Sequence, residues 1–272
     1  MKQGTILLSF DTEEFDLPRE HGTDISIKDG VKVSKQGVLK ILAILDKTNV
    51  KATFFCTANF AKAEPALIKK IAKSGHEIAC HGVDHFCPKP SDVEISKSTI
   101  EKLLGHKITG YRQPRMQPID YQKMQDLGYL YDSSVNPALI PGRYNHLDTP
   151  RKPFKKQGII EIPTSVATPL RIPLFWLALH LFPQKLYLIL AKSSLKKTGY
   201  FATYFHPWEF TDLSKYPCVP KYIKFGSNQV LVKKLENTIK ALQKSGYTFS
   251  TYTDFASNTA NHTLRKPNLK KS

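Results

Sequence analysis

Short apolar runs alternate with longer amphipathic stretches along most of the chain, and this alternation predicts where strands and helices lie. Continuous runs of apolar and β-branched residues indicate buried strands, whereas apolar residues repeating every three to four positions indicate helices. We predict strands over 5–10, 51–56, 76–80, 108–112, 129–132, 158–163, 199–205 and 247–251. We predict helices over 38–49, 58–74, 92–104, 119–127 and 229–245, most of them ended by a glycine.

The order of these elements indicates the fold class. Strand and helix alternate, with the longer loops after the strands, as in parallel βαβ units. With this many units we expect an α/β fold arranged as a (β/α) barrel of seven or eight units. Residues 17–34 and the proline-rich 136–157 interrupt the pattern and are expected to be loops. Residues 1–257 should form a single domain, followed by a basic, flexible tail over 258–272.

Ionisable side chains follow two of the predicted strands directly. Asp11, Glu13 and Glu14 come after the first strand, and His81 and His85 after the third. Two histidines four positions apart on a tightly turned segment present both rings to one side, so they can bind one metal ion. Because the chemistry of such barrels lies where the strands end at their C-terminal side, we expect these groups to meet.

Three further strands end in Arg112, Asp132 and His206. A bound divalent metal lowers the pKa of a water, a nearby carboxylate can take its proton, and a histidine can protonate an amine leaving group. The metal and a backbone N–H would stabilise the oxyanion. The set therefore predicts metal-assisted hydrolysis of an acyl bond. A solvated acidic turn after the first strand, and a turn-capping role for Asp132, are the structural alternatives.

Charge narrows the choice of partner. The chain carries 40 Lys and Arg against 23 Asp and Glu, a formal net charge of +17 at pH 7. Such an excess favours an anionic partner, such as nucleic acid, an acidic lipid surface or an acidic glycan. No recognition-helix, zinc-finger or base-stacking pattern accompanies the basic residues, which argues against nucleic acid. A basic surface that binds only solvent is the alternative.

The four cysteines, at positions 56, 80, 87 and 218, are expected to be free thiols. The apolar run that opens the chain is too short for a secretory signal and lacks a small-residue cleavage site. These features favour a reducing, cytoplasmic setting. A structural zinc cluster of Cys80, Cys87 and the two nearby histidines is the alternative, although its spacing departs from the common zinc motifs.

Residues 170–195 are strongly apolar, but Pro173, His180 and Pro183 interrupt them, so the unbroken runs are too short to span a bilayer. We expect a helix of the barrel with a capping loop, and we expect His180 to be a surface or packing residue. The alternative is an apolar lip that holds a lipid-linked substrate. Segment 170–197 would then make peripheral contact with the acidic inner face of a membrane through its lysines.

Five short motifs occur in a characteristic order: Ser9-Phe10-Asp11, His81-Gly82-Val83-Asp84-His85, Arg112-Gln113-Pro114, Asp132-Ser133-Ser134 and Phe205-His206-Pro207-Trp208. In this order, over roughly residues 4 to 251, the chain resembles the polysaccharide deacetylases, the NodB-homology domain of carbohydrate esterase family four. The resemblance implies a distorted (β/α) barrel. It also implies a hydrolase with a divalent metal, often zinc, that removes N-acetyl groups from sugars by cleaving linear C–N bonds, or removes O-acetyl groups.

The family's motifs imply a role for each matching residue. Asp11 would be the catalytic base and His206 the general acid. Arg112 would buttress the site, and Asp132 would orient a catalytic partner. The backbone N–H of Arg115 would lie near the oxyanion, and Pro114 and Trp208 would contact the substrate. A purely structural role in the core is the alternative for the tryptophan.

The two histidines of 81–85 would bind the metal together with a carboxylate. The family usually carries a second aspartate directly after the base as the third ligand, and this chain has Thr12 there. Glu13, one residue further on, is expected to take the role, and Glu14 is the alternative.

Three functions follow from these features. The first is a metal-dependent amidohydrolase that deacetylates a carbohydrate. The second keeps the fold but changes the substrate to a cyclic amide, or to an acyl or formyl group on a lipid-linked sugar. The third is a non-catalytic carbohydrate- or membrane-binding barrel whose site is weakened at Thr12. Metal analysis combined with acetate release separates the three.

Overall fold

The predicted strands form one sheet in the computed structural model, which describes residues 4–140 and 144–264. The order across the sheet is β12 (Tyr200–Phe205), β1 (Thr5–Thr12), β2 (Thr53–Cys56), β3 (Glu77–Cys80), β4 (Gly110–Tyr111), β5 (Tyr131–Asp132), β9 (Ile159–Glu161) and β8 (Phe154–Lys156). A further strand, β13 (Thr248–Ser250), pairs in parallel with β1. All neighbours from β12 to β9 are parallel, and β8 joins β9 antiparallel at the edge.

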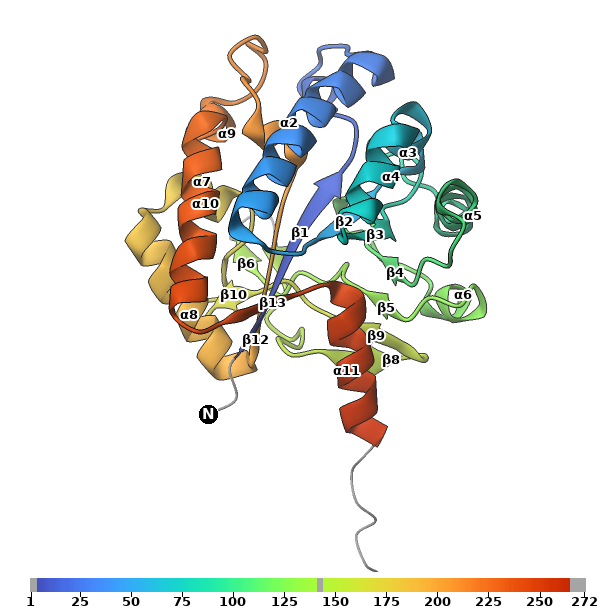
Figure 1. Ribbon diagram of the computed structural model, residues 1–272, viewed down its shortest axis with the longest axis vertical. Coiled ribbons are helices and arrows are strands. Elements are labelled where there is room, and N and C mark those ends of the chain that lie inside the picture. The colour runs from blue at the N-terminus through green and yellow to red at the C-terminus, as the bar shows by residue number, and fades with distance from the viewer. Residues whose placement is uncertain (1–3, 141–143, 265–272) are drawn as a thin grey trace, which may run out of the picture.

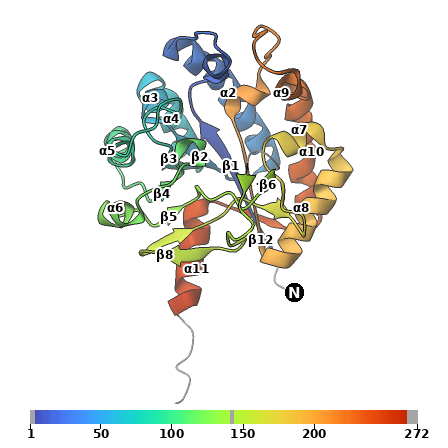
Figure 2. The ribbon, with the colours of Figure 1, turned by 180° about the vertical axis from the view of Figure 1, so that it is seen from behind.

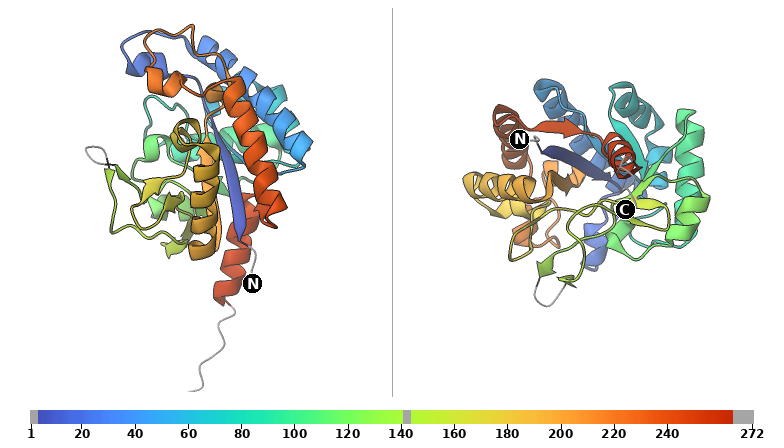
Figure 3. Two further views of the ribbon diagram at one scale, coloured as in Figure 1. Left: turned by 90° about the vertical axis from the view of Figure 1, so that its left-hand side faces the viewer. Right: turned by 90° about the horizontal axis from the view of Figure 1, so that it is seen from below.

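The sheet curls strongly around an interior, and among the described residues β12 and β8 remain its two ends. Seen from below, helices surround the curled strands (Figure 3). The predicted α/β fold and the distorted (β/α) barrel are therefore confirmed. Because successive strands are parallel, their C-terminal ends gather at one mouth, toward which the head of β1 points in Figure 1.

The helices that cover the outside of the sheet are α2 (Ile27–Thr48), α3 (Ala58–Ala63), α4 (Pro65–Lys73), α5 (Asp92–Leu104), α6 (Tyr121–Asp126), α8 (Gln184–Thr198) and α10 (Gln229–Lys244) (Figure 1). Shorter helices lie in the loops after strands: α1 (Leu17–Glu20), η1 (Pro114–Met116), α7 (Leu177–Leu181), η2 (Pro207–Phe210) and α9 (Lys221–Lys224). Two small antiparallel pairs, β6 (Leu139–Ile140) with β7 (Tyr144–Asn145) and β10 (Val166–Ala167) with β11 (Ile172–Pro173), complete the connections. Strands β6 and β8 face the viewer in Figure 2.

Strand alternation divides the core in two. Along β1, Ile6, Leu8 and Phe10 point outward into the large cluster beneath the helices, whereas Leu7 points into the barrel. The inner cluster also receives Tyr252 from α11 (Tyr252–Leu264), a helix at the end of the barrel opposite the head of β1 (Figure 1). The end that α11 covers is thus filled with apolar side chains, which leaves the opposite mouth for polar ones.

Some predicted boundaries were wrong, for local reasons. The helix expected over 58–74 is two helices, because Glu64 precedes a proline and leaves helical geometry (φ −127°, ψ 54°). The loop expected over 17–34 contains α1 and the first turns of α2, which begins where the Ser26 hydroxyl accepts a hydrogen bond from the Asp29 N–H. The loop expected over 136–157 contains β6, β7 and β8.

The expected tail over 258–272 is helical as far as Leu264, because α11 continues through it. Residues 265–272 lie outside the described residues, and the domain boundary stays a prediction. Within the described ranges, none of the helices combines the length and apolar composition that a membrane span requires.

Helix α2 fixes the position of η2, the short helix that follows β12. A Cβ atom at Gly37 of α2 would lie 1.7 Å from the carbonyl oxygen of Pro207, so only glycine permits this approach. The Lys40 ammonium, one turn further along α2, donates to the carbonyl of Phe210 at 2.8 Å. The backbone that carries His206 is therefore held rigidly against the outer helix.

Candidate metal and catalytic site

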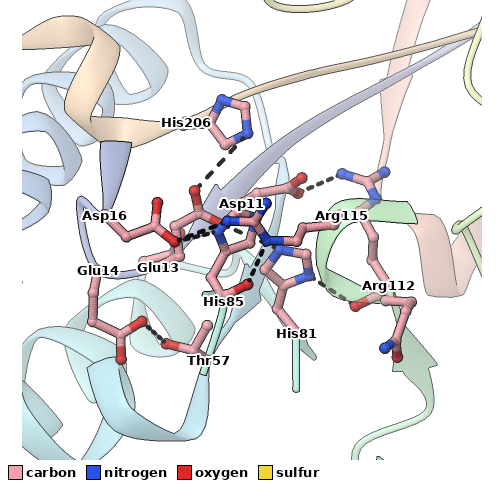
Figure 4. Close-up of polar contacts among 12 residues, drawn as sticks. Asp11, Glu13, Glu14, Asp16, Thr57, His81, His85, Arg112, Arg115 and His206 are labelled. Carbon is pink, nitrogen blue, oxygen red and sulfur yellow. Dashed lines mark hydrogen bonds and ion pairs between the residues drawn. The ribbon is translucent and has the colours of Figure 1, made fainter. Parts of the chain in front are cut away.

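The ends of four strands on one part of the sheet bring predicted site residues together. Asp11 and Glu13 come from the end of β1, His81 from β3, Arg112 from β4 and His206 from β12. Figure 4 shows Glu13 close to both histidines of the 81–85 segment and to His206. The parallel order of the strands explains this meeting of residues that are far apart in the sequence.

Three side chains form a candidate metal site. The Oε2 atom of Glu13 lies 3.3 Å from Nε2 of His81 and 3.3 Å from Nε2 of His85. One donor atom from each residue falls within 4.8 Å of the others. Two imidazole nitrogens and one carboxylate oxygen are a donor set typical of an open zinc-type site, with room for water or substrate.

The hydrogen bonds of the two rings leave both Nε2 atoms directed toward Glu13. His81 places Nδ1 at 2.8 Å from the carbonyl oxygen of Arg112, and a carbonyl can only accept. Nδ1 of His81 therefore carries a hydrogen, and Nε2 is the nitrogen left to bind a metal ion. His85 places Nδ1 at 2.8 Å from Oδ2 of Asp16, which orients its ring in the same way. Such partners behind a ligand ring are typical of metal-binding histidines.

The charge and the hydrogen bonding of Glu13 also fit a cation. Its Oε2 atom is buried and has no hydrogen-bond partner among the described residues, although Oε1 accepts from Trp208 Nε1 at 3.2 Å. Burial alone would lower the pKa of His85, but the negative charge of Glu13 and the contact with Asp16 outweigh it and raise the pKa to about 9. The same negative charge favours a bound metal ion. Glu13, His81 and His85 are thus suited to hold one.

Glu14 points away from this cluster. Its Oε2 atom accepts a hydrogen bond from the Thr57 hydroxyl at 3.1 Å (Figure 4). Burial raises the pKa of Glu14 to about 7. Between the two carboxylates left open by the sequence, the geometry favours Glu13 as the metal ligand.

Asp11 and Arg112 form a buried ion pair beside the candidate metal site. Oδ1 of Asp11 lies 2.5 Å from NH1 of Arg112. Burial alone would raise the pKa of Asp11, but the charge of Arg112, with smaller contributions from His81 and His206, outweighs it and lowers the pKa. Asp11 is therefore ionised and lines the cavity, as a proton acceptor must.

The fully buried Arg112 uses its donors on every side. Nε donates to the carbonyl of Ser133 at 3.0 Å, NH1 donates to the Ser9 hydroxyl at 3.0 Å, and NH2 reaches the hydroxyls of Ser133 and Tyr252 at 3.0 and 3.1 Å. The guanidinium also lies 4.0 Å above the ring centre of Phe55. Arg112 thus connects β1, β4, β5 and α11 through one side chain.

His206 also faces the candidate metal site, next to Glu13. Its Nε2 lies 4.0 Å from Oε1 of Glu13, and its Nδ1 lies 2.8 Å from Oε1 of Glu209. The ring stacks on Trp208, with centroids 4.8 Å apart and an interplanar angle of 14°. Burial alone would lower the pKa of His206, but the carboxylates of Glu13 and Glu209 outweigh it and raise the pKa. This favours the protonated ring that a general acid needs.

The carboxylate beside the His206 ring comes from Glu209, and Asp132 has other partners. Asp132 was expected to orient a catalytic partner, but its carboxylate accepts from the backbone N–H and hydroxyl of Ser134 at 2.9 and 2.7 Å. Asp132 also faces Glu161 across β5 and β9. The carboxylate that holds the His206 ring is Glu209, which sequence reasoning missed, although its position three residues after the histidine was a usable signal.

The pair of Asp132 and Glu161 predicts a pH-dependent stability. Burial, and then the charge of Asp132, raises the pKa of Glu161 well above its ordinary value of 4.5. The folded protein therefore keeps a proton that the unfolded chain releases. As a result, the contribution of the pair to the free energy of unfolding falls as pH rises above 4.5, by about 1.4 kcal/mol per pH unit. Glu161→Gln keeps a donor without titrating. We expect denaturant unfolding to show this variant gaining stability over the wild type between about pH 5 and pH 8.

The matched control is Glu94→Gln, which removes a carboxylate whose side chain is 61% exposed. Its difference from the wild type should not change with pH. Parallel stability curves for the wild type and Glu161→Gln would show that the buried pair holds no extra proton.

The segment after Arg112 lies along the mouth. Pro114 is buried and begins η1, and it packs so closely on Gly82 that a Cβ atom at Gly82 would lie 3.0 Å from Cγ of Pro114. Gly82 also has a φ of +69°, which favours glycine. Arg115 directs its side chain toward the acidic loop, with Nε donating to the carbonyl of His85 at 3.2 Å and NH2 2.6 Å from Glu20.

A cavity of about 630 Å³ opens over the candidate metal site. Its polar wall contains the three candidate metal ligands and, in addition, Asp11, Gln113, Asn136 and His206. Its other wall is apolar and comes mainly from β11, α7 and α9, with Ile172, Phe175, Trp176, Leu177, Leu181 and Ile223. Trp208 lines the cavity between the two walls and is 3% exposed, so it serves the core and the site together.

Comparison with known proteins agrees with this geometry. Residues 2–130 match the model of the polysaccharide deacetylase family. The chain is 44% identical over 82 residues, 28% of its length, to the peptidoglycan-N-acetylmuramic acid deacetylase PdaA of Bacillus subtilis, of which the match covers 31%. The matches span between 14% and 40% of the length of the curated relatives.

Solved structures share the fold. A putative polysaccharide deacetylase from Mycobacterium smegmatis superposes with a TM-score of 0.69 at 18% identity, over 100% of this chain and 96% of that one. A family four pseudoenzyme from Bacillus anthracis superposes with a TM-score of 0.53 at 14% identity, over 93% of this chain and 66% of that one. Residues 2–130 therefore belong to the polysaccharide deacetylase family by their match to its model, and the whole chain shares the fold of solved structures described as polysaccharide deacetylases or as family four proteins.

Proposed function

We propose that this protein is a metal-dependent deacetylase that hydrolyses the N-acetyl, or O-acetyl, group of a carbohydrate. One observation carries the proposal: one ring nitrogen of His81, one of His85 and one carboxylate oxygen of Glu13 lie within 4.8 Å of one another, between Asp11 and His206. A divalent metal, with zinc as the expected ion, fits this donor set. When bound, it supplies an acidified water and polarises the acyl carbonyl.

The residues of the chain would then divide the proton transfers. Asp11, kept ionised by Arg112, accepts the proton of the attacking water. His206, with Nδ1 held by Glu209, delivers a proton from Nε2 to the leaving nitrogen or oxygen of the sugar. The tetrahedral oxyanion needs a donor besides the metal, and we assign the backbone N–H of Arg115 to it.

A carbohydrate substrate is supported by the family and by the name of the relative PdaA. The apolar wall of the cavity supports a more specific form, a sugar carried on a lipid. That wall continues into exposed apolar side chains, with Leu181 46% and Phe225 64% exposed, and Lys185 and Lys221 are exposed beside them. We propose that this rim contacts an anionic membrane surface, in keeping with the predicted cytoplasmic setting.

The test combines metal analysis with acyl release. Protein loaded with zinc, manganese or cobalt is incubated with N-acetylglucosamine oligomers and with a lipid-linked N-acetyl sugar, and free acetate is measured. Release of acetate from either substrate supports the proposal. Faster release from the lipid-linked sugar supports the proposal that the apolar wall of the cavity binds a lipid-carried substrate.

Two outcomes contradict the proposal. Stoichiometric metal without acetate release would indicate another acyl substrate, such as a formyl group or a cyclic amide. Neither metal nor acetate release would indicate a non-catalytic barrel, a state for which the family has the Bacillus anthracis pseudoenzyme as a precedent.

A further inference from the structure

A buried row of three side chains leads from the cavity into the protein. Glu209 is fully buried, and its two carboxylate oxygens contact two different histidines. Oε1 lies 2.8 Å from Nδ1 of His206 and accepts the backbone N–H of the same residue. Oε2 lies 2.6 Å from Nε2 of His180, on α7, which is also fully buried. The row is therefore His206, Glu209, His180.

The position of the hydrogens follows from the last contact of the row. Nδ1 of His180 lies 3.1 Å from the carbonyl oxygen of Phe225, which can only accept, so Nδ1 carries a hydrogen. A single proton then lies between Nε2 of His180 and Oε2 of Glu209. The other oxygen of Glu209 accepts the Nδ1 hydrogen of His206. This leaves Nε2 of His206 as the nitrogen that faces Glu13 and the cavity.

Glu209 depends on both contacts. Burial alone would raise the pKa of Glu209, but the hydrogen bonds from His180 and His206 outweigh it and lower the pKa. A buried carboxylate oxygen without a partner is costly, so loss of one histidine would favour protonation or rotation of the carboxyl group. Either change would remove the acceptor that fixes the His206 ring.

His180 is itself held rigidly. The ammonium of Lys234, on α10, donates to the carbonyl of His180 at 2.9 Å. On the other side, Gly226 approaches so closely that a Cβ atom there would lie 3.1 Å from the same carbonyl. The histidine is thus fixed to α10 and to the loop after α9, at a distance from the candidate metal ligands.

We infer that His180 is a positioning residue for the proposed deacetylation: it holds Glu209 so that Glu209 keeps the His206 ring with Nε2 toward the substrate. The inference rests on the proposed function for its effect on rate. The arrangement of the three side chains does not depend on that function. A histidine that merely fills space on α7 would have no such effect on His206.

Two polar variants of similar size separate these roles. His180→Gln places an amide N–H near the position of Nε2 and can still donate to Glu209, whereas His180→Asn retains the contact with the Phe225 carbonyl but is too short to reach Glu209. We expect His180→Asn to bind zinc as the wild type does and to lose about 10- to 100-fold in kcat, with KM little changed. His180→Gln should recover most of the rate. Wild-type kcat in His180→Asn would overturn the inference.

A second readout is independent of activity. Long-range nitrogen–proton NMR of the histidine rings, recorded at a pH high enough for the His206 ring to be neutral and assigned with a His206→Gln variant, reports which nitrogen of His206 carries the hydrogen. We expect Nδ1 in the wild type and in His180→Gln, and a mixture in His180→Asn. If the wild type released no acyl group, the proposed function would fail, and unchanged His206 signals in His180→Asn would separately overturn the role of His180.

Discussion

Replacing Glu13 with alanine is expected to remove stoichiometric metal from the folded protein and to lower acetate release by about a thousandfold or more. The reason is geometric. Glu13 supplies the only carboxylate oxygen of the candidate cluster found among the described residues, and its Oε2 lies 3.3 Å from both imidazole nitrogens. Metal content by elemental analysis, together with zinc titration, measures the first effect directly.

Glu14→Ala is the matched control, because it removes a buried carboxylate one position further along the same loop. Glu14 contacts Thr57 rather than the histidines, so this variant should keep its metal. One zinc per chain in Glu13→Ala would reject the assignment. Loss of metal in Glu14→Ala alone would transfer the ligand role to Glu14.

Replacing Arg112 with methionine is expected to destabilise the protein by about 3–5 kcal/mol and to abolish deacetylation. The variant leaves the Asp11 carboxylate buried without its cationic partner, and the hydroxyls of Ser9 and Tyr252 lose a donor. With the guanidinium gone, burial raises the pKa of Asp11 unopposed by that charge, so the proposed base loses its ionised form. Urea unfolding at neutral pH measures the stability.

Arg115→Met serves as the control for stability. The Arg115 side chain is 32% exposed and pairs with Glu20 at the surface of the mouth, so its loss should cost no more than about 1 kcal/mol. Arg112→Lys should recover little, since one ammonium cannot replace a fork of donors that reaches five groups on different elements. An Arg112→Met variant within about 1 kcal/mol of the wild type would show that the buried network is dispensable.

Much of the candidate site could be predicted from the sequence because it depends on strand ends. Asp11, His81, Arg112 and His206 each follow a short apolar run, and apolar runs separated by amphipathic helices specify parallel strands with a common mouth. The partner of His206 was within reach too, since Glu209 follows it at a spacing typical of a capped turn. Their roles in catalysis stay predictions until activity is measured.

The sequence by itself determined the fold class, the order of the strands' polar ends and the family, because these follow from local periodicity and from motifs contiguous in the chain. Only the tertiary structure favours Glu13 over Glu14 as the candidate metal ligand. Phe15 packs against Trp208 and Tyr216, with ring centroids 5.6 and 4.8 Å apart, and so fixes the end of the acidic loop. In this loop the Glu13 carboxylate points to the two histidines and the Glu14 carboxylate points to Thr57.

The same holds for His180. Its partner Glu209 lies 29 residues further along the chain, on a different element, and nothing in the local sequence links the two. Their contact exists because α7 and η2 both pack against α10. Contacts between distant elements depend on how the helices pack on the curled sheet. Apolar periodicity predicts only which face of each element is buried, not which side chains of two elements meet.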